Sequence, residues 1–199
     1  MSAQISKLAT VSDGAILGEG VIVWDFSKVR ENSIIGDHTL IGDYVYIDIN
    51  VSIGKNCKIQ NSTLLFDPCI LHDGVFIGPG VILTNDHNPR AISSIGAKKV
   101  STDWDKVGVE VFTGASIGAG TVCIAPVKIG TWAMIGAGSV VTKDVPNFAL
   151  VLGNPARQVG WVGKKGLKLI PLDDSNFLCP VTNEKYSLSN GILSEMANK

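Results

Sequence analysis

The sequence predicts an all-β fold in which six-residue repeats build a parallel β-helix. Every sixth residue from Ile5 to Leu83 is Ile, Leu or Val, and every sixth residue from Ala9 to Val81 is small or β-branched. A period of six fits neither an α-helix nor a strand with alternating faces. It fits a solenoid in which each flat face takes six residues, so that three faces close one coil and the stacked coils bury a continuous apolar column.

A second block of repeats has the same period in a different register. Its large positions fall on every sixth residue from Val111 to Val141, and its small positions start at Ala115. Leu83 and Val111 are 28 residues apart, which is not a multiple of six. We therefore expect the chain to leave the coil between the two blocks and to return to it afterwards.

The predicted domain map has two parts. A β-helix occupies residues 1–160 and carries an excursion loop at 87–110, and a C-terminal cap or tail occupies 161–199. A cap is expected because the open end of a β-helix exposes apolar residues and unpaired backbone groups. Within the cap, we expect a short helix over Trp161–Leu169 and a strand or hairpin over Phe177–Leu188.

Glycine recurs directly after the large aliphatic position of the repeat. Glycine tolerates backbone dihedrals that other residues avoid, so this position predicts the corners of the coil. The glycines in this position are Gly18, Gly36, Gly42, Gly54, Gly78, Gly118, Gly130 and Gly136.

Composition excludes several classes of protein. The chain of 199 residues has 45% hydrophobic and 18% charged residues and a net charge of -1. It has no basic stripe of the kind that binds nucleic acid, and no apolar run long enough to span a membrane. The first ten residues lack the pattern of a secretory signal, so we expect a cytoplasmic protein.

The cysteines do not suggest a metal site. None of the four forms a C-x-x-C pair, which argues against a zinc ribbon, and Cys57, Cys69 and Cys123 fall on inward positions of the repeat. We interpret them as small buried side chains and expect no metal.

The repeat resembles that of the hexapeptide-repeat acyltransferases, which form left-handed β-helices and act as homotrimers. The start of the excursion, Thr84-Asn85-Asp86-His87-Asn88-Pro89-Arg90-Ala91, sharpens the likeness. Segment 74–91 resembles N-acetyltransferases that acylate the 3-amino group of nucleotide-linked sugars. Further matching stretches are Lys55–Asn61, Gly114–Ile124, Ile135–Pro155 and Cys179–Thr182.

Within that group, the sequence is most similar to enzymes acting on UDP-2-acetamido-3-amino-2,3-dideoxyglucuronate in surface-polysaccharide biosynthesis, including O-antigen and lipopolysaccharide. The resemblance implies acetyl-CoA as co-substrate, a nucleotide-sugar acceptor, and active sites between the subunits of a homotrimer. The sequence departs from the family pattern at Gly42-Asp43-Tyr44, where a Gly-Gln-Asn run is frequent, and at Ala125-Pro126, where Cys-Gly is common.

Two residues of the excursion are the predicted catalytic residues. The resemblance places Asn85 beside the attacking amine, where its amide oxygen can accept an N–H bond and direct the lone pair. The alternative is an asparagine that closes a turn. His87 could act as a general base, because histidine titrates near neutral pH, or could be a solvated loop residue. The resemblance does not require a histidine at this position.

Four residues are the predicted substrate contacts. Arg90 could bind the sugar carboxylate or the diphosphate, or could form a salt bridge that fixes the loop. Asp86 lies in the same run. His38 and His72 lie in the first block and could face the cleft of a neighbouring subunit, or water.

The predicted acetyl-CoA contacts lie in the second block and just after it. The resemblance implies that the pantetheine arm runs along the outside of the coils between subunits and that the nucleotide end lies near the final coils. Small residues there would let an extended chain approach the backbone. The alternative reading of the glycines is corner geometry. These candidates are Gly118, Ala119, Gly136, Ala137, Lys143, Asn154 and Arg157.

Three other functions remain open from the sequence. One is an N-acetyltransferase for a dTDP-3-amino-3,6-dideoxyhexose, which lacks the carboxylate. Another is a non-catalytic β-helix that serves as an assembly subunit. The third is a zinc carbonic anhydrase, whose three histidine ligands would include two that are close in sequence, whereas the histidines here stand at 38, 72 and 87.

Overall fold

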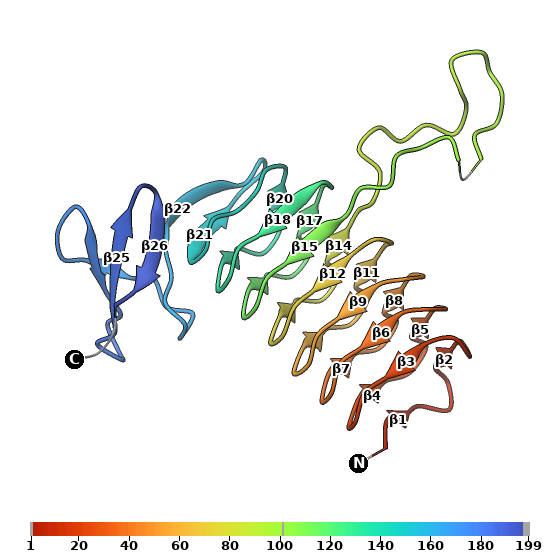
Figure 1. Ribbon diagram of the computed structural model, residues 1–199, viewed down its shortest axis with the longest axis horizontal. Coiled ribbons are helices and arrows are strands. Elements are labelled where there is room, and N and C mark those ends of the chain that lie inside the picture. The colour runs from red at the N-terminus through yellow and green to blue at the C-terminus, as the bar shows by residue number, and fades with distance from the viewer. Residues whose placement is uncertain (1, 101, 197–199) are drawn as a thin grey trace.

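The computed structural model describes residues 2–100 and 102–196 and shows an all-β fold (Figure 1). Three sheets wrap into one solenoid, the left-handed β-helix that was predicted, and their strands are parallel except for the last strand of the nine-stranded sheet, which pairs antiparallel. The nine-stranded sheet contains β1 (Gln4–Ile5), β4 (Ile22–Val23), β7 (Leu40–Ile41), β10 (Lys58–Ile59), β13 (Phe76–Ile77), β16 (Ser116–Ile117), β19 (Met134–Ile135), β21 (Ala149–Leu152) and β22 (Arg157–Trp161).

The other two faces have the same ladder-like order. The seven-stranded sheet contains β2 (Thr10–Val11), β5 (Lys28–Val29), β8 (Tyr46–Ile47), β11 (Leu64–Leu65), β14 (Ile82–Leu83), β17 (Val122–Cys123) and β20 (Val140–Val141). The six-stranded sheet contains β3 (Ile16–Leu17), β6 (Ile34–Ile35), β9 (Ser52–Ile53), β12 (Ile70–Leu71), β15 (Val109–Val111) and β18 (Val127–Ile129).

Register between coils follows the sequence repeat. Ile41 pairs with Ile59, and Ile59 pairs with Ile77, so each strand of the first block lies over the strand 18 residues earlier. The large aliphatic residues are buried along this column. The polar residues at the small positions are buried as well, because their hydroxyls bond to backbone carbonyls: Thr39 Oγ1 donates to the Gly54 carbonyl of the next coil at 2.9 Å.

The prediction of unusual dihedrals at the glycines that follow the large position was wrong. Left-handed backbone conformations occur two residues later, as at Gly20, His38 and Gly80. The earlier glycines are explained by the spacing of the coils. A Cβ at Gly78 would lie 2.6 Å from the backbone nitrogen of Ala119 in the next coil, so only glycine fits there.

Three corners run along the solenoid, one between each pair of neighbouring sheets. The glycine corner joins the nine- to the seven-stranded sheet and includes 42–44, 78–80, 118–120 and 136–138. The loop corner joins the seven- to the six-stranded sheet and includes 48–50, 66–68, 124–126 and 142–144. The histidine corner joins the six- to the nine-stranded sheet and includes 36–38, 54–56, 72–74 and 112–114.

The excursion loop replaces one turn of the loop corner and projects away from the coils (Figure 1). It begins after β14, which ends at Leu83, and it returns at β15, where Leu71 pairs with Val111. The turns of the loop corner in the coils before and after it, at Asp67–Pro68 and Ala125–Pro126, contain cis peptide bonds.

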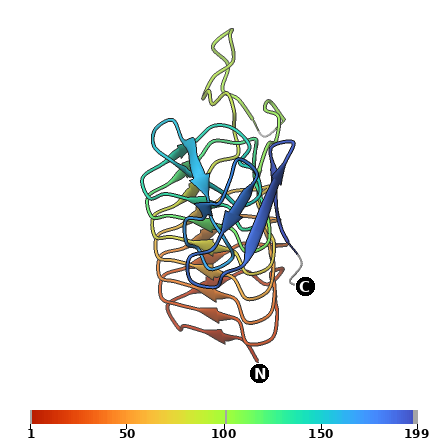
Figure 2. The same cartoon turned by 90° about the vertical axis from the view of Figure 1, so that its left-hand side faces the viewer.

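The C-terminal end of the coil is covered by a small antiparallel sheet (Figure 2). Its strands are β23 (Ile170–Pro171), β24 (Asn176–Leu178), β25 (Lys185–Ser189) and β26 (Ile192–Glu195). β24 and β25 form the hairpin that was predicted over Phe177–Leu188. Phe148 of the last coil packs with Tyr186 of this cap, with ring centroids 5.4 Å apart.

The prediction of a short helix over Trp161–Leu169 was wrong. This segment is a turn, in which Val162 and Lys168 form an antiparallel bridge. Gly163 and Gly166 are the physical reason, because glycine disfavours helix and Gly166 adopts a φ of +75°. Over the described parts of the chain, no helix is long and apolar enough to cross a membrane.

Candidate active site

The root of the excursion loop is held by the coils on both sides of it. Asn85 Nδ2 donates a hydrogen bond of 2.9 Å to the carbonyl of Asp67 in the preceding coil. His87 Nδ1 lies 3.1 Å from the carbonyl of Ala125 in the following coil. The backbone nitrogen of Ala125 in turn donates to Thr84 Oγ1 at 3.0 Å. The first residues of the loop therefore have fixed positions although the loop itself projects into solvent.

The contact with Asp67 orients the amide of Asn85. Because a carbonyl can only accept, the Asn85 nitrogen must point toward Asp67. Its Oδ1 is then the atom available to accept a hydrogen bond from a bound ligand, and Asn85 lines a hollow under the loop.

The contact with Ala125 selects a tautomer of His87. The carbonyl accepts, so Nδ1 carries the hydrogen, and Nε2 of the neutral ring has a free lone pair. A ring in this state can accept a proton at Nε2. His87 lines a second hollow, which adjoins the first.

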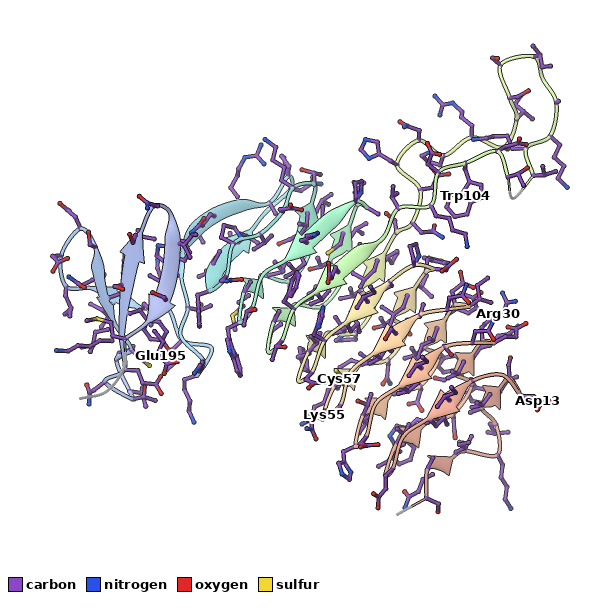
Figure 3. The ribbon with its side chains drawn as sticks, in the orientation of Figure 1. Asp13, Arg30, Lys55, Cys57, Trp104 and Glu195 are labelled. Atoms are coloured by element: carbon purple, nitrogen blue, oxygen red, sulfur yellow. The ribbon has the colours of Figure 1, made fainter. Side chains whose placement is uncertain are left out.

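The two hollows share the walls formed by Asp86, Lys99 and Trp104. Figure 3 shows Trp104 on the part of the loop nearest the coils. The first hollow has a volume of about 480 Å³. It is lined by Asn85, Asp86, Arg90, Ala91, Lys98, Lys99, Val100 and Trp104.

Cations outnumber anions around the first hollow. Arg90, Lys98 and Lys99 line it together with one carboxylate, Asp86. In the described ranges, none of the three cations forms an ion pair within 4.0 Å of a carboxylate. The salt bridge considered for Arg90 is therefore absent there, and its guanidinium donates only to the carbonyl of Pro89. Asp86 accepts from the backbone nitrogen of Asn88 at 2.8 Å, which shapes the turn.

His38 and His72 lie on the histidine corner, so a single chain does not bring them to the loop root. His38 is exposed and has a φ of 57°. His72 Nε2 lies 3.0 Å from Glu110 Oε1, and its ring stacks on Phe112 with centroids 4.9 Å apart. His72 therefore has a structural role on its own face of the solenoid.

The small residues predicted to contact acetyl-CoA lie on the glycine corner. Ala119 and Ala137 are exposed there. Gly118 is explained by coil stacking, since a Cβ on it would lie 2.5 Å from the backbone nitrogen of Ala137. Gly136 is explained in the same way by Leu152, at 2.8 Å.

The basic candidates lie elsewhere. Lys143 and Arg157 line one hollow of about 340 Å³ at the end of the coil. Lys143 belongs to the loop corner, two coils beyond the excursion loop. Asn154 lies in the exposed turn that leads from β21 to β22. The seven candidates thus form separate groups on the surface of one chain.

Sequence reasoning missed several residues of this region. Asp67, Lys106 and Trp104 contact or line the loop root, yet none belongs to the T-N-D-x-N-P-R run. Asp67 precedes a proline at a corner, which in sequence indicates only a turn. Its proximity to the loop arises because it lies one coil earlier.

The described residues contain no group of three or more His, Cys, Asp or Glu side chains placed to hold a metal ion. The histidines of a carbonic-anhydrase-like site are split between two corners. All four cysteines are buried free thiols. Burial raises the pKa of Cys123 to about 12 and holds the pKa of Cys69 above its usual range.

The sequence matches known proteins over its repeats. A family model described as bacterial transferase hexapeptide (six repeats) matches residues 14–48. A model described as hexapeptide repeat of succinyl-transferase matches 33–66 and 106–143. These matches cover both blocks of repeats and leave out most of the excursion loop.

Curated relatives are named as acetyltransferases or bifunctional enzymes. The dTDP-3-amino-3,6-dideoxy-alpha-D-galactopyranose 3-N-acetyltransferase of Aneurinibacillus thermoaerophilus is 46% identical over 83 residues, which is 42% of each chain. Bifunctional protein GlmU of Thermotoga petrophila is 47% identical over 78 residues, or 36% of this chain and 17% of that protein. This chain therefore spans less than half the length of either relative.

Solved structures share the architecture. WeeI from Acinetobacter baumannii AYE superimposes with a TM-score of 0.50 and 25% identity, over 74% of this chain and 56% of that one. The repeat period, the stacked parallel sheets and these matches agree. The chain carries hexapeptide repeats similar to those of bacterial transferases over residues 14–66 and 106–143.

Proposed function

We propose that this chain is an acetyl-CoA-dependent N-acetyltransferase that acylates the 3-amino group of a nucleotide-linked amino sugar. The observation that carries the proposal is the anchored amide of Asn85, a residue that lines the hollow under the excursion loop. Identity of 46% with a protein named as a 3-N-acetyltransferase supports the same reaction class.

The reaction proceeds by direct attack of the sugar amine on the thioester carbonyl. Asn85 Oδ1 accepts one N–H of the amine and directs its lone pair at the carbonyl carbon. The new C–N bond forms, backbone N–H groups stabilise the oxyanion, and the C–S bond then breaks to release the CoA thiolate. The proton lost by the nitrogen passes to His87 Nε2, whose lone pair is exposed by the bond from Nδ1 to Ala125.

Two acceptors fit this site, and different observations favour each. The sequence likeness favours UDP-2-acetamido-3-amino-2,3-dideoxyglucuronate. The cations of the first hollow, Arg90, Lys98 and Lys99, support such a strongly anionic substrate. The relative named for a dTDP-3-amino-3,6-dideoxy sugar favours a neutral deoxyhexose, for which the same cations would meet only the diphosphate.

The residues present also fit acetyl-CoA. Lys143 and Arg157 offer two cations at one hollow, on the coil end reached along the loop corner from Asn85. The glycine corner and the histidine corner lie on other edges of the same chain. A site that used Ala119, Ala137, His38 or His72 beside Asn85 would need neighbouring subunits, which supports the proposal of a homotrimer. We also propose that the enzyme works in the cytoplasm, in the synthesis of a surface polysaccharide.

A thiol-release assay with acetyl-CoA and each acceptor tests the function. Turnover of the UDP-linked sugar acid alone would support the sugar-acid substrate and the role of Arg90. Turnover of the dTDP-linked 3-amino-deoxyhexose alone would keep the reaction and replace the substrate. Thiol release with neither would contradict the proposal and favour the non-catalytic reading.

A further inference from the structure

Asp67 contacts both ends of the excursion loop. Its backbone carbonyl accepts from Asn85 Nδ2 at the start of the loop, at 2.9 Å. Its carboxylate accepts from Lys106 Nζ at the end of the loop, at 2.5 Å. Asn85 and Lys106 are far apart along the chain, and this one residue of the preceding coil joins them.

The two partners of the ion pair between Asp67 and Lys106 differ in solvent exposure. The Asp67 side chain is only 7% exposed, whereas the Lys106 side chain is 51% exposed. Among the residues that the structure describes, the other side-chain donor to the carboxylate is Asn50 Nδ2, at a long 3.5 Å. Without Lys106, a nearly buried negative charge would keep one weak partner, and a buried charge without its partner forces the surrounding structure to rearrange.

We propose that Asp67 and Lys106 form a clamp that positions Asn85 for the reaction. Both are positioning residues, because neither needs to touch the substrate. The inference rests on the proposed function, in which Asn85 orients the amine.

The clamp acts through the turn at Phe66–Pro68. The carboxylate and the carbonyl belong to the same residue, so a change of the turn that re-solvates the carboxylate also moves the acceptor of Asn85. The backbone nitrogen of Asp67 adds a contact to Asp48 Oδ2 at 3.4 Å, which ties the turn to the coil before it. Misplacement of an orienting group by about 1 Å can cost about a hundredfold in rate.

Steady-state kinetics of lysine variants test the clamp. Lys106→Met keeps the length of the side chain and removes the charge, and we expect kcat to fall about tenfold with the KM for acetyl-CoA unchanged. Lys106→Arg keeps the charge and should retain most of the activity. Lys55→Met is the matched control, because Lys55 forms an exposed pair with Asp73 at 3.9 Å on the histidine corner (Figure 3). It should behave like the parent protein.

A double variant tests whether the unpaired charge of Asp67, and not the changed shape of the Lys106 side chain, slows the reaction. Asp67→Asn with Lys106→Met removes both charges and keeps the backbone carbonyl that Asn85 needs. We expect this variant to recover to within about threefold of the parent rate, a non-additive result. A normal kcat for Lys106→Met, or a double variant as slow as Lys106→Met, would overturn the clamp.

Two further measurements separate the clamp from the proposed function. Asn85→Ala is assayed in parallel. If Asn85→Ala is slow and Lys106→Met is fast, the clamp is contradicted and the catalytic role of Asn85 stands. If Asn85→Ala is fast, the catalytic role of Asn85, on which the clamp rests, is contradicted. Trypsin cleavage after Lys98 and Lys99 reports the order of the loop without any turnover. It should be faster in Lys106→Met than in the double variant, and equal rates would contradict the clamp even if neither acceptor is a substrate.

Discussion

Asn85 and His87 are two residues apart and are anchored to opposite neighbours. The Asn85 amide donates to Asp67 in the coil before the excursion loop, and His87 Nδ1 donates to Ala125 in the coil after it. The two side chains therefore have their free polar atoms, Oδ1 and Nε2, defined by the stacking of the solenoid.

The amide of Asn85 should be needed for turnover. We expect Asn85→Ala to lower kcat about tenfold or more, because the amine loses the acceptor that directs its lone pair. Asn85→Asp should also be slow, since a carboxylate cannot donate to the Asp67 carbonyl and would be turned away from it. Asn190→Ala, in the hairpin turn of the cap, is the control. Steady-state kinetics make the measurement, and unchanged turnover in Asn85→Ala would remove the proposed role.

His87 should matter most near neutral pH. We expect His87→Ala to lower kcat about tenfold at pH 7, because the base that receives the amine proton is lost. The deficit should shrink toward about pH 9, where hydroxide is more abundant and can take the proton in place of His87. A pH–rate profile of both proteins tests this. Equal profiles would show that Asn85 and the backbone suffice.

Arg90 should affect the acceptor and leave acetyl-CoA binding unchanged. It lines the hollow beside Asn85, far along the loop corner from the hollow that holds Lys143 and Arg157. We expect Arg90→Ala to raise the KM for the nucleotide sugar about tenfold, the loss of one charge-assisted contact. Arg157→Ala should instead raise the KM for acetyl-CoA. A similar rise of both KM values in each variant would contradict the separation of the two sites.

The glycines of the repeat should fall into two stability classes. Gly78→Ala would place a Cβ 2.6 Å from the backbone nitrogen of Ala119, which forces coils apart. We expect it to reduce the free energy of unfolding by about 2–3 kcal/mol, the upper part of the range that overpacking typically costs. Gly80→Ala is the matched control, because its φ is +68° and the space around it is open. It should cost only about 1–2 kcal/mol of backbone strain. Denaturant unfolding of both variants makes the comparison, and equal losses would show that backbone conformation alone sets the glycine pattern.

The buried thiols should limit stability at high pH. Burial raises the pKa of Cys123 from an ordinary value of 9.0 to about 12. The unfolded chain ionises first as the pH rises, so the stabilisation from the neutral thiol is complete below pH 9 and is lost between about pH 9 and about pH 12. We expect Cys123→Ala to flatten the fall of Tm across that window. A Cys179→Ala control should not, because the Thr182 hydroxyl lowers the pKa of Cys179. Parallel slopes in parent and Cys123→Ala would refute the assignment.

Much of the fold could be predicted because the repeat is a periodic burial signal. Ile41, Ile59 and Ile77 stack in register, and their spacing can be counted directly in the sequence. The cap could not be predicted as well, because it has no repeat. The pattern around Trp161–Leu169 suggested a helix, and the turn at Gly163–Gly166 formed instead where the chain folds back toward the last coil.

The candidate site was predictable only in part. The run that contains Asn85 and His87 stands out in the sequence, but Asp67, Ala125 and Lys106 do not. Asp67 and Ala125 meet that run because consecutive coils bring residues 18 or more positions apart to the same corner, and Lys106 is linked to it through Asp67. His38 and His72, chosen from residue type alone, lie on a different corner of the chain.

The sequence by itself determined the solenoid, because a six-residue alternation of large and small buried residues has one compact solution in stacked coils. Only the tertiary structure decided the orientation of the Asn85 amide and the tautomer of His87. Those depend on hydrogen bonds to carbonyls of adjacent coils, and the backbone of any residue type can supply a carbonyl. Such contacts leave no mark in the amino-acid sequence.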